Sequence, residues 1–370
     1  MSKTTTSGTS TAIRDADIYI VVIGVGGVGT AFLQQVAALQ STTWPNLKVL
    51  LITRSSKSLY TEKDHDFLNG IPLSNWSRDL SSSAQASLSP AQILTYITKA
   101  QNRKAPPRRF IVVDNTSSQV VADLYPTFLS QGINIITPNK KAFSSSWPLW
   151  ESIQAAAYST ENTSGGLIYH ESSVGAGLPV ISTLNDLVST GDRIRRIEGV
   201  FSGTMSYLFN NFAPVDSSQE GETWSAIVKK AKDLGYTEPD PRDDLNGVDV
   251  ARKLVILARL SGLRVRDTSS FPVQSLIPEA LRASDLTVDT FMARLPEFDG
   301  EMEKVKSEAE KTGKVVRFVG SVDFNTKKVQ VGMEMFDKGS PVAGLKGADN
   351  IVSFYTERYG DRSLVIQGPG

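Results

Sequence analysis

The stretch of sequence that decides the fold runs from residue 18 to residue 39 and reads IYIVVIGVGGVGTAFLQQVAAL. It opens with an apolar run rich in β-branched residues, which predicts a buried strand over residues 18–23. Three glycines follow in the spacing G-x-G-x-x-G, and the next ten residues have a helical pattern. A strand, a glycine turn and a helix in this order predict one βα unit of a dinucleotide-binding domain.

Each glycine of this motif has its own reason to lack a Cβ atom. Gly24 permits the tight turn off the strand, Gly26 lets a pyrophosphate approach the backbone, and Gly29 lets the helix pack closely on the sheet. The free N–H groups and the dipole of the helix N-terminus favour negative charge beside Gly27 and Val28. We therefore expect these five residues to bind a dinucleotide, although a purely structural glycine turn is the alternative.

The end of the second expected strand indicates which dinucleotide binds. A carboxylate at this place would accept hydrogen bonds from the ribose 2′-OH of NAD(H), but the sequence here is Thr-Arg-Ser-Ser-Lys over residues 53–57. The guanidinium of Arg54 and the ammonium of Lys57, together with two hydroxyls, suit a 2′-phosphate better. NADP(H) is therefore favoured, NAD(H) stays possible, and a solvated basic loop is the alternative reading.

The pattern of elements divides the chain into two domains after a Ser/Thr-rich tail over residues 1–17, which we expect to be disordered. Residues 18–165 alternate strands and helices, including one helix over residues 119–130, which predicts a Rossmann-type parallel sheet. Residues 166–370 predict an α+β domain. Its antiparallel or mixed sheet is expected from strands over residues 196–201, 315–322, 328–335, 352–357 and 363–367.

Composition excludes several classes of protein. Lys+Arg and Asp+Glu both number 39, so no broad cationic field is available to hold a nucleic acid. The absence of cysteine excludes disulfides, thiolate metal sites and cysteine nucleophiles. The sequence has no run of eighteen apolar residues and no apolar core of a signal peptide, so we expect a cytoplasmic protein that does not enter a membrane.

Residue counts also limit which side chain could donate the proton in a hydride-transfer reaction. His65 and His170 are the only histidines, and none of the ten tyrosines has a lysine four residues later. A histidine acid of the lactate dehydrogenase type thus has one weak candidate, His170, and the Tyr-x-x-x-Lys pair is missing. The proton donor is therefore expected to be a lysine, assisted by carboxylates and water.

The densest polar cluster reads TEPDPRDDLNGVDVARK over residues 237–253. Two prolines stiffen its first part, and Asp249 and Lys253 lie four residues apart on the helix that follows, so they share one face. A surface salt bridge is the ordinary interpretation of such a pair. The strongly apolar residues 254–257 favour a buried helix instead, with Lys253 as a candidate catalytic group.

Several motifs together make the chain resemble homoserine dehydrogenases, in a fungal-like, monofunctional form. They are the glycine loop and residues 114–117, 137–141, 169–179, 199–204 and 238–253, in the family's order from residue 18 to the end of the chain. The resemblance implies NAD(P)-dependent reduction of L-aspartate 4-semialdehyde to L-homoserine, a small amino-acid substrate, in the aspartate-derived pathway to threonine and methionine. It also implies a homodimer, with residues 166–370 as the substrate-binding and dimerisation domain.

The resemblance also implies roles for single residues. Substrate-site positions match Gly203, Thr204, Glu238, Asp244 and Asp249, whose acids would hold the α-ammonium group and orient catalytic groups. Lys253 matches the lysine assigned as proton donor, with Lys140 as a rival. Cofactor positions match Thr116, Lys140 and Gly370. Because the sequence ends at Gly370, where relatives continue into a helix, we expect weaker cofactor binding or activity.

A monovalent cation site is implied as well. It would hold a sodium ion on the carboxylate of Glu171 and the main-chain oxygens of Val174, Ala176 and Leu178, and a glycine-rich loop can turn several carbonyls toward one hard cation. The alternative is a tight helix entry. Two rival functions also stay open: an NADP-dependent dehydrogenase for another small polar aldehyde or hydroxy acid, and an inactive dinucleotide-binding sensor.

Overall fold

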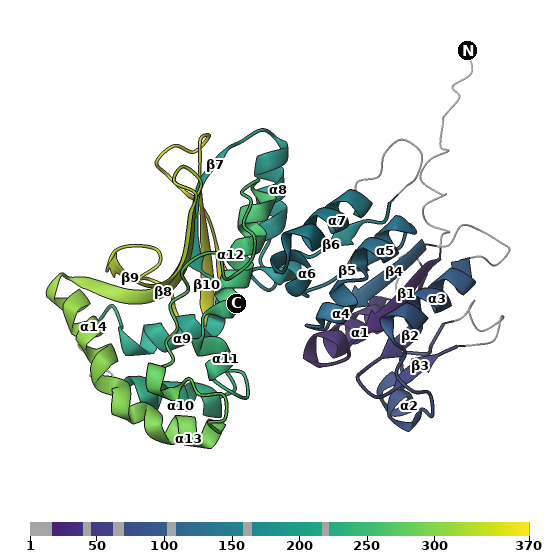
Figure 1. The fold of residues 1–370 in the computed structure, drawn as a ribbon, viewed down its shortest axis with the longest axis horizontal. Helices are drawn as coiled ribbons and strands as arrows, with labels where there is room; N and C mark the ends of the chain where they lie inside the picture. The colour runs from purple at the N-terminus through teal and green to yellow at the C-terminus, as the bar shows by residue number, and fades with distance from the viewer. Residues whose placement is uncertain are drawn as a thin grey trace, which may run out of the picture. The chain divides into compact units, whose positions relative to one another are not determined.

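The computed structural model describes residues 17–39, 46–61, 70–101, 109–157, 165–216 and 222–369. The chain forms two compact units (Figure 1). The first unit comprises Met1–Ala142 and Pro148–His170, and the second comprises Phe143–Trp147 and Glu171–Gly370. The chain thus enters the second unit for five residues, returns to the first, and leaves it for good after His170. Residues 1–16 of the expected tail lie outside the described part of the chain.

The first unit is built on a six-stranded sheet with the order β3-β2-β1-β4-β5-β6. Its strands are β1 (Ile18–Ile23), β2 (Leu47–Thr53), β3 (Ser58–Tyr60), β4 (Arg109–Asp114), β5 (Asn134–Ile136) and β6 (Ile168–Tyr169). Five of them pair in parallel, which confirms the Rossmann-type prediction. The edge strand β3 was not predicted: it turns back from β2 and pairs with it antiparallel.

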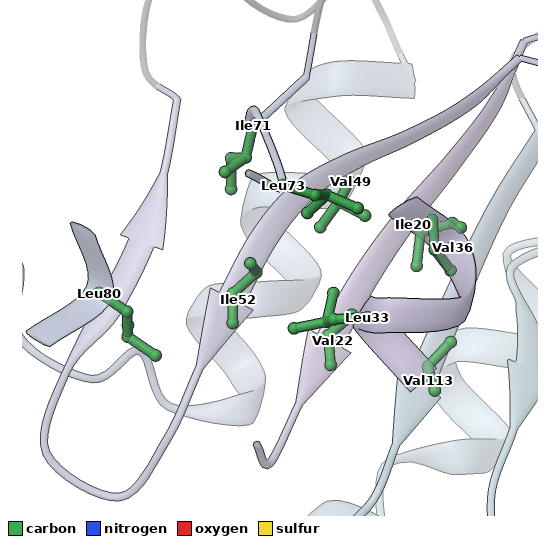
Figure 2. Packing of buried hydrophobic residues seen from close by; sticks show 10 residues of the cluster. All are labelled: Ile20, Val22, Leu33, Val36, Val49, Ile52, Ile71, Leu73, Leu80 and Val113. Carbon is green, nitrogen blue, oxygen red and sulfur yellow. The ribbon is translucent and has the colours of Figure 1, made fainter. Parts of the chain in front are cut away.

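The helices of the first unit follow its strands in alternation. They are α1 (Gly27–Leu39), α2 (Trp76–Ser82), α3 (Pro90–Gln101), α4 (Gln119–Ala122), α5 (Tyr125–Ser130), α6 (Lys141–Ser144) and α7 (Trp147–Ala157), the last two at the first crossing between the units. Figure 2 shows Leu33 and Val36 of α1 packed on the β-branched side chains of β1, within the core of this unit. This contact fixes the start of α1 at the carboxyl end of β1.

One expected helix is in fact two. We expected a single helix over residues 119–130, but α4 ends at Ala122 and α5 begins at Tyr125. Pro126 is the physical reason, because it has no N–H to donate to the carbonyl of Ala122 and its ring crowds that turn. The break places Tyr125 at the start of a new helix, with its whole side chain buried.

The second unit contains a five-stranded sheet with the order β11-β10-β7-β8-β9. Its strands are β7 (Ile194–Val200), β8 (Lys314–Asp323), β9 (Lys328–Asp337), β10 (Asp349–Thr356) and β11 (Leu364–Pro369). Every neighbouring pair in this sheet is antiparallel, as the tight turns in the sequence predicted. The hairpin of β8 and β9 is paired over ten residues of each strand, from Lys314↔Asp337 to Asp323↔Lys328.

The helices of the second unit include α8 (Val180–Ser189), α9 (Gly203–Phe212), α10 (Trp224–Asp233), α11 (Arg242–Leu245), α12 (Val248–Leu260), α13 (Val288–Arg294) and α14 (Asp299–Lys311). Helix α12 packs directly on β8, because a Cβ atom built on Gly320 would lie 2.8 Å from Leu254. The predicted burial of α12 is therefore confirmed. Among the described residues, no helix has the length and hydrophobicity needed to cross a membrane.

Candidate functional site

Two positions of the glycine loop must be glycine for the fold itself, and the others border open space. Gly24 has a φ of +86°, and a Cβ atom on Gly29 would lie 2.2 Å from the main-chain oxygen of Gly24, so both positions exclude a side chain. No atom lies within 4 Å of a Cβ built on Gly26 or Gly27, and Val28 is 60% exposed. The first N–H groups of α1 therefore border open space, which fits the approach of a pyrophosphate.

A pocket of about 360 Å³ lies beside the glycine loop at the carboxyl ends of β1 and β2. It combines one guanidinium and several hydroxyls with apolar side chains, a mixture suited to a phosphate-bearing nucleoside. Its lining residues are Ile23, Gly24, Thr53, Arg54, Ser55, Ser87, Leu88, Pro90, Ile93, Thr116, Ser118, Val120 and Val121. The residues present therefore fit the adenosine half of a dinucleotide.

Arg54 is the cation of this pocket. The neighbouring Lys57 does not line it, and its ammonium contacts the main-chain oxygen of Ser81. The hydroxyl of Ser87 donates to the main-chain oxygen of Arg54 over 2.7 Å, which fixes the backbone that carries the guanidinium. The sequence did not identify Ser87 and Leu88 as pocket residues, because no local pattern shows that their loop reaches the second strand.

The loop after β4 joins the glycine loop. The main-chain N–H and the hydroxyl of Thr116 both donate to Asp114 Oδ1, over 2.9 Å and 2.7 Å. A Cβ atom on Gly24 would lie 2.8 Å from the methyl group of Thr116, so the two loops are in contact. Lys140 follows β5 in the same unit and is partly buried. Gly370, the remaining cofactor position, lies outside the described residues.

In the second unit, the ammonium of Lys253 is held inside the protein. Its Nζ lies 2.8 Å from Asp249 Oδ2 and donates to the main-chain oxygen of Phe201 over 2.6 Å. The Lys253 side chain is 12% exposed, whereas that of Asp249 is 46% exposed. An ordinary surface salt bridge would leave both groups in water. The pair predicted from the spacing therefore forms, with its cation withdrawn from solvent.

The acidic loop before α12 gathers around Thr204, the second residue of α9. The Thr204 hydroxyl lies 2.9 Å from Asp244 Oδ1 and 2.6 Å from the main-chain oxygen of Tyr236. The other carboxylate oxygen of Asp244 accepts from the main-chain N–H of Glu238 over 2.8 Å. Gly203 begins α9, whose N-terminus Ser202 caps. The structure thus assembles these substrate-site candidates from two segments, the start of α9 and the acidic loop, whose contacting residues are 32 and 40 positions apart in sequence.

The Lys253–Asp249 pair and the acids around Thr204 influence one another electrostatically. Burial raises the pKa of Asp244 above its ordinary value, and the negative charges of Glu238 and Asp249 raise it further. Asp249, the partner of Lys253, is therefore close enough to act on Asp244. Three acids around one partly buried site repel one another and attract a cation, so the arrangement favours a ligand that carries an ammonium group.

Glu171 has a different immediate partner from the one that we expected. Its two carboxylate oxygens accept the N–H groups of Ile181 and Ser182 over 2.7 Å and 2.8 Å, at the N-terminus of α8. The preceding turn has positive φ at both Gly175 and Ala176, so it is a tight helix entry. The main-chain oxygen of Leu178 accepts from Val180. Helix capping therefore accounts for the position of the Glu171 carboxylate, and the sodium ion stays a prediction.

His170, the weak histidine candidate of the sequence, is buried. Burial lowers the pKa of His170 to about 4, so its imidazole is neutral at pH 7. His65 lies outside the described residues. The lowered pKa disfavours the protonated imidazole that a histidine acid needs, and a lysine stays the expected proton donor.

Comparisons with known proteins cover nearly the whole chain. A family profile described as homoserine dehydrogenase matches residues 179–370, and one described as homoserine dehydrogenase, NAD binding domain, matches residues 24–164. A homoserine dehydrogenase of Paracoccidioides brasiliensis is 55% identical over 361 residues, which cover 95% of this chain and 93% of that protein.

Solved structures resemble the fold over the same length. A crystal structure of a protein of unknown function from Candida auris is 43% identical with a TM-score of 0.85, and covers 96% of this chain and 93% of its own. A hyperthermophilic archaeal homoserine dehydrogenase in complex with NADPH has the same fold at 22% identity, with a TM-score of 0.65 and coverage of 96% and 92%. Both profiles and the fungal relative agree: the chain belongs to the homoserine dehydrogenases, oxidoreductases with an NAD-binding domain.

Proposed function

We propose that this chain reduces the aldehyde of L-aspartate 4-semialdehyde to L-homoserine, with NADPH as the hydride donor. The observation that carries this proposal is the withdrawn ammonium of Lys253, which is held by Asp249 and Phe201 beside the acids of the substrate-site cluster. A plain hydroxy acid has no ammonium group to pair with these carboxylates. An amino-acid aldehyde presents both an ammonium group for the acids and a carbonyl oxygen for the lysine.

The reaction follows from the properties of these side chains. Asp244 and Glu238 bind the α-ammonium group of the substrate and fix the direction of its aldehyde. When bound, NADPH supplies a hydride to the aldehyde carbon. Lys253 stabilises the negative charge that develops on the oxygen and donates a proton to it. Asp249 reaches solvent and returns a proton to Lys253 through water.

The test is NADPH oxidation in the presence of aspartate semialdehyde. Lys253→Ala should lower kcat by about 10²–10⁴-fold with little change in NADPH affinity, because it removes a positioned proton donor. Arg252→Ala, one residue earlier on the same helix, is the matched control and should keep wild-type kinetics. Full turnover by Lys253→Ala, together with loss of turnover in Lys140→Ala, would transfer the donor role to Lys140. NADPH binding without turnover in the wild type would instead indicate a sensor.

NADP(H) preference is part of the proposal and rests on Arg54 in the adenosine pocket. Arg54→Ala should weaken NADPH binding about tenfold to a hundredfold, the usual effect of losing a charge-assisted hydrogen bond, and leave NADH binding nearly unchanged. Fluorescence titration with both nucleotides measures this difference. Equal affinity of the wild type for the two nucleotides would remove the role of Arg54. The archaeal NADPH complex supports the same preference by analogy of fold.

A sodium ion and a homodimer stay predictions of the resemblance. The ion would lie on the carboxylate of Glu171 and the main-chain oxygens of Val174, Ala176 and Leu178, and the same carboxylate accepts the N–H groups at the start of α8. Its role would be structural, since none of the proposed chemical steps uses it. A cytoplasmic location likewise stays a prediction.

A further inference from the structure

A completely buried carboxylate lies at the carboxyl end of β4, where the reaction has no direct use for it. Asp114 has no exposed surface. Its two oxygens accept four hydrogen bonds from neutral groups: the N–H and hydroxyl of Thr116, the hydroxyl of Tyr125 over 2.6 Å, and the side-chain amide of Asn139 over 3.1 Å. Burial of an acid is costly unless such donors surround it.

Three of the four donors come from the two loops that carry cofactor-side residues. Thr116 belongs to the loop after β4, and Asn139 immediately precedes Lys140 in the loop after β5. The amide nitrogen of Asn139 also donates to the main-chain oxygen of Ser118 over 2.9 Å, while its amide oxygen accepts from the N–H of Lys141 over 3.2 Å. The side chain of Asn139 therefore brackets the backbone of Lys140 and ties it to Asp114.

Tyr125 completes the cluster from α5. Its hydroxyl is buried between Asp114 and Thr137, at 2.6 Å and 2.9 Å. Burial, followed by the negative charge of Asp114, raises the pKa of Tyr125 well above its ordinary value. The hydroxyl therefore stays protonated and acts as a hydrogen-bond donor throughout the neutral range.

We propose that Asp114 is a positioning residue, whose buried carboxylate holds the Thr116 loop and the Lys140 loop in the conformation that cofactor binding and hydride transfer require. A structural core at this place could be apolar, and it would avoid the cost of burying an acid. What the acid adds is a single acceptor for donors on both loops. The inference rests on the proposed function in that it takes Thr116 and Lys140 as active-site residues.

Asp114→Asn is the primary test, because it preserves the shape and turns one acceptor into a donor that must face other donors. We expect kcat/KM for NADPH to fall about 100-fold, as is typical when catalytic groups are displaced by about 1 Å, with cooperative unfolding retained. Asp192→Asn is the control: that carboxylate is also buried, with its side chain 1% exposed, but lies in the second unit beside Arg358. This variant should lose stability and keep its kinetics.

Tyr125→Phe provides a second test that keeps the fold if Asp114→Asn does not. It removes one donor of four and leaves the ring in place, so we expect a drop in kcat/KM of about tenfold, which is the effect of one hydrogen bond to a charged group. Wild-type kinetics in a folded Tyr125→Phe protein and in Asp114→Asn would overturn the proposal.

A double-mutant cycle with Lys140→Ala separates positioning from a general loss of stability. If Asp114 acts through the Lys140 loop, the double variant should be at most about threefold slower than Lys140→Ala alone, whereas independent effects would multiply. If the rate losses of Asp114→Asn and Lys140→Ala multiplied in the double variant, Asp114 would not act through the Lys140 loop. If Lys140→Ala were fully active, the role proposed for Lys140 would fail, and the NADPH affinity of Asp114→Asn, measured by fluorescence, would still decide whether Asp114 positions the Thr116 loop.

Discussion

At the scale of single residues, the surroundings of buried polar groups were the hardest feature to predict from the sequence. Lys253 was identified from its spacing to Asp249, but its second partner, the main-chain oxygen of Phe201, lies 52 residues earlier in the chain. The sequence pattern of α12 indicates which face of the helix is apolar, and it does not indicate which backbone oxygen that face meets. The identity of the catalytic candidate was therefore predictable, and its surroundings were not.

His170 gives a prediction for stability against pH. Its pKa is about 4 in the folded chain and near the ordinary 6.5 when unfolded, so the unfolded chain binds the extra proton between these values. Stability should therefore fall as pH drops from 6.5 to 4, by up to about 3 kcal/mol from this residue. His170→Gln should show a shallower fall in urea unfolding over this range. If the stability of the wild type and of His170→Gln fell equally between pH 6.5 and pH 4, the lowered pKa of His170 would be contradicted.

At the scale of elements, the regular strands and helices followed their local patterns closely. The strand over residues 18–23 has the predicted bounds. We did not predict α14, which is mostly charged and buries only Met302 and Ala309, so its hydrophobic periodicity is weak. The short edge strand β3 was missed for a similar reason, because three residues do not establish an alternation.

The glycine loop supplies a matched pair of variants at this scale. Gly29→Ala should destabilise the first unit by about 2 kcal/mol or more, since its new methyl group would overlap the main-chain oxygen of Gly24. Gly26→Ala meets no atom and should leave stability unchanged or raise it by about 0.5 kcal/mol, while it obstructs the pyrophosphate. Thermal unfolding and NADPH titration of both variants test this assignment. Unchanged NADPH affinity in Gly26→Ala would place the phosphates elsewhere.

At the scale of the whole molecule, one arginine secures the five residues by which the chain first enters the second unit. Arg259 of α12 is 4% exposed and donates to the main-chain oxygens of Phe143 and Ser145, over 2.6 Å each. It also donates to the main-chain oxygens of Val265 and Arg266, and burial lowers its pKa to about 10. A guanidinium provides enough donors in one plane for this set of carbonyls, and no other side chain does.

Arg259→Met should therefore destabilise the second unit by about 3 kcal/mol or more, because it leaves several buried carbonyls without a donor. Arg264→Met is the matched control. Both arginines lie over the ring of Trp147, at 5.5 Å and 5.2 Å, but Arg264 is exposed to solvent. Its loss should change stability by about 0.5–1 kcal/mol. Urea unfolding followed by tryptophan fluorescence measures both, and equal losses would show that the ring contact matters and the carbonyls do not.

The sequence by itself determined the order of elements, the Rossmann-type first unit, the antiparallel second sheet and the family, because glycine spacing, hydrophobic periodicity and long polar motifs are local properties of the chain. Only the tertiary structure decided how polar groups are paired. Several decisive partners are distant in sequence: Asn139 lies 25 residues from Asp114, Phe201 lies 52 residues from Lys253, and Phe143 lies 116 residues from Arg259. Pairing of this kind depends on which backbone and side-chain groups folding brings within about 3 Å of one another, and a linear pattern does not contain that distance.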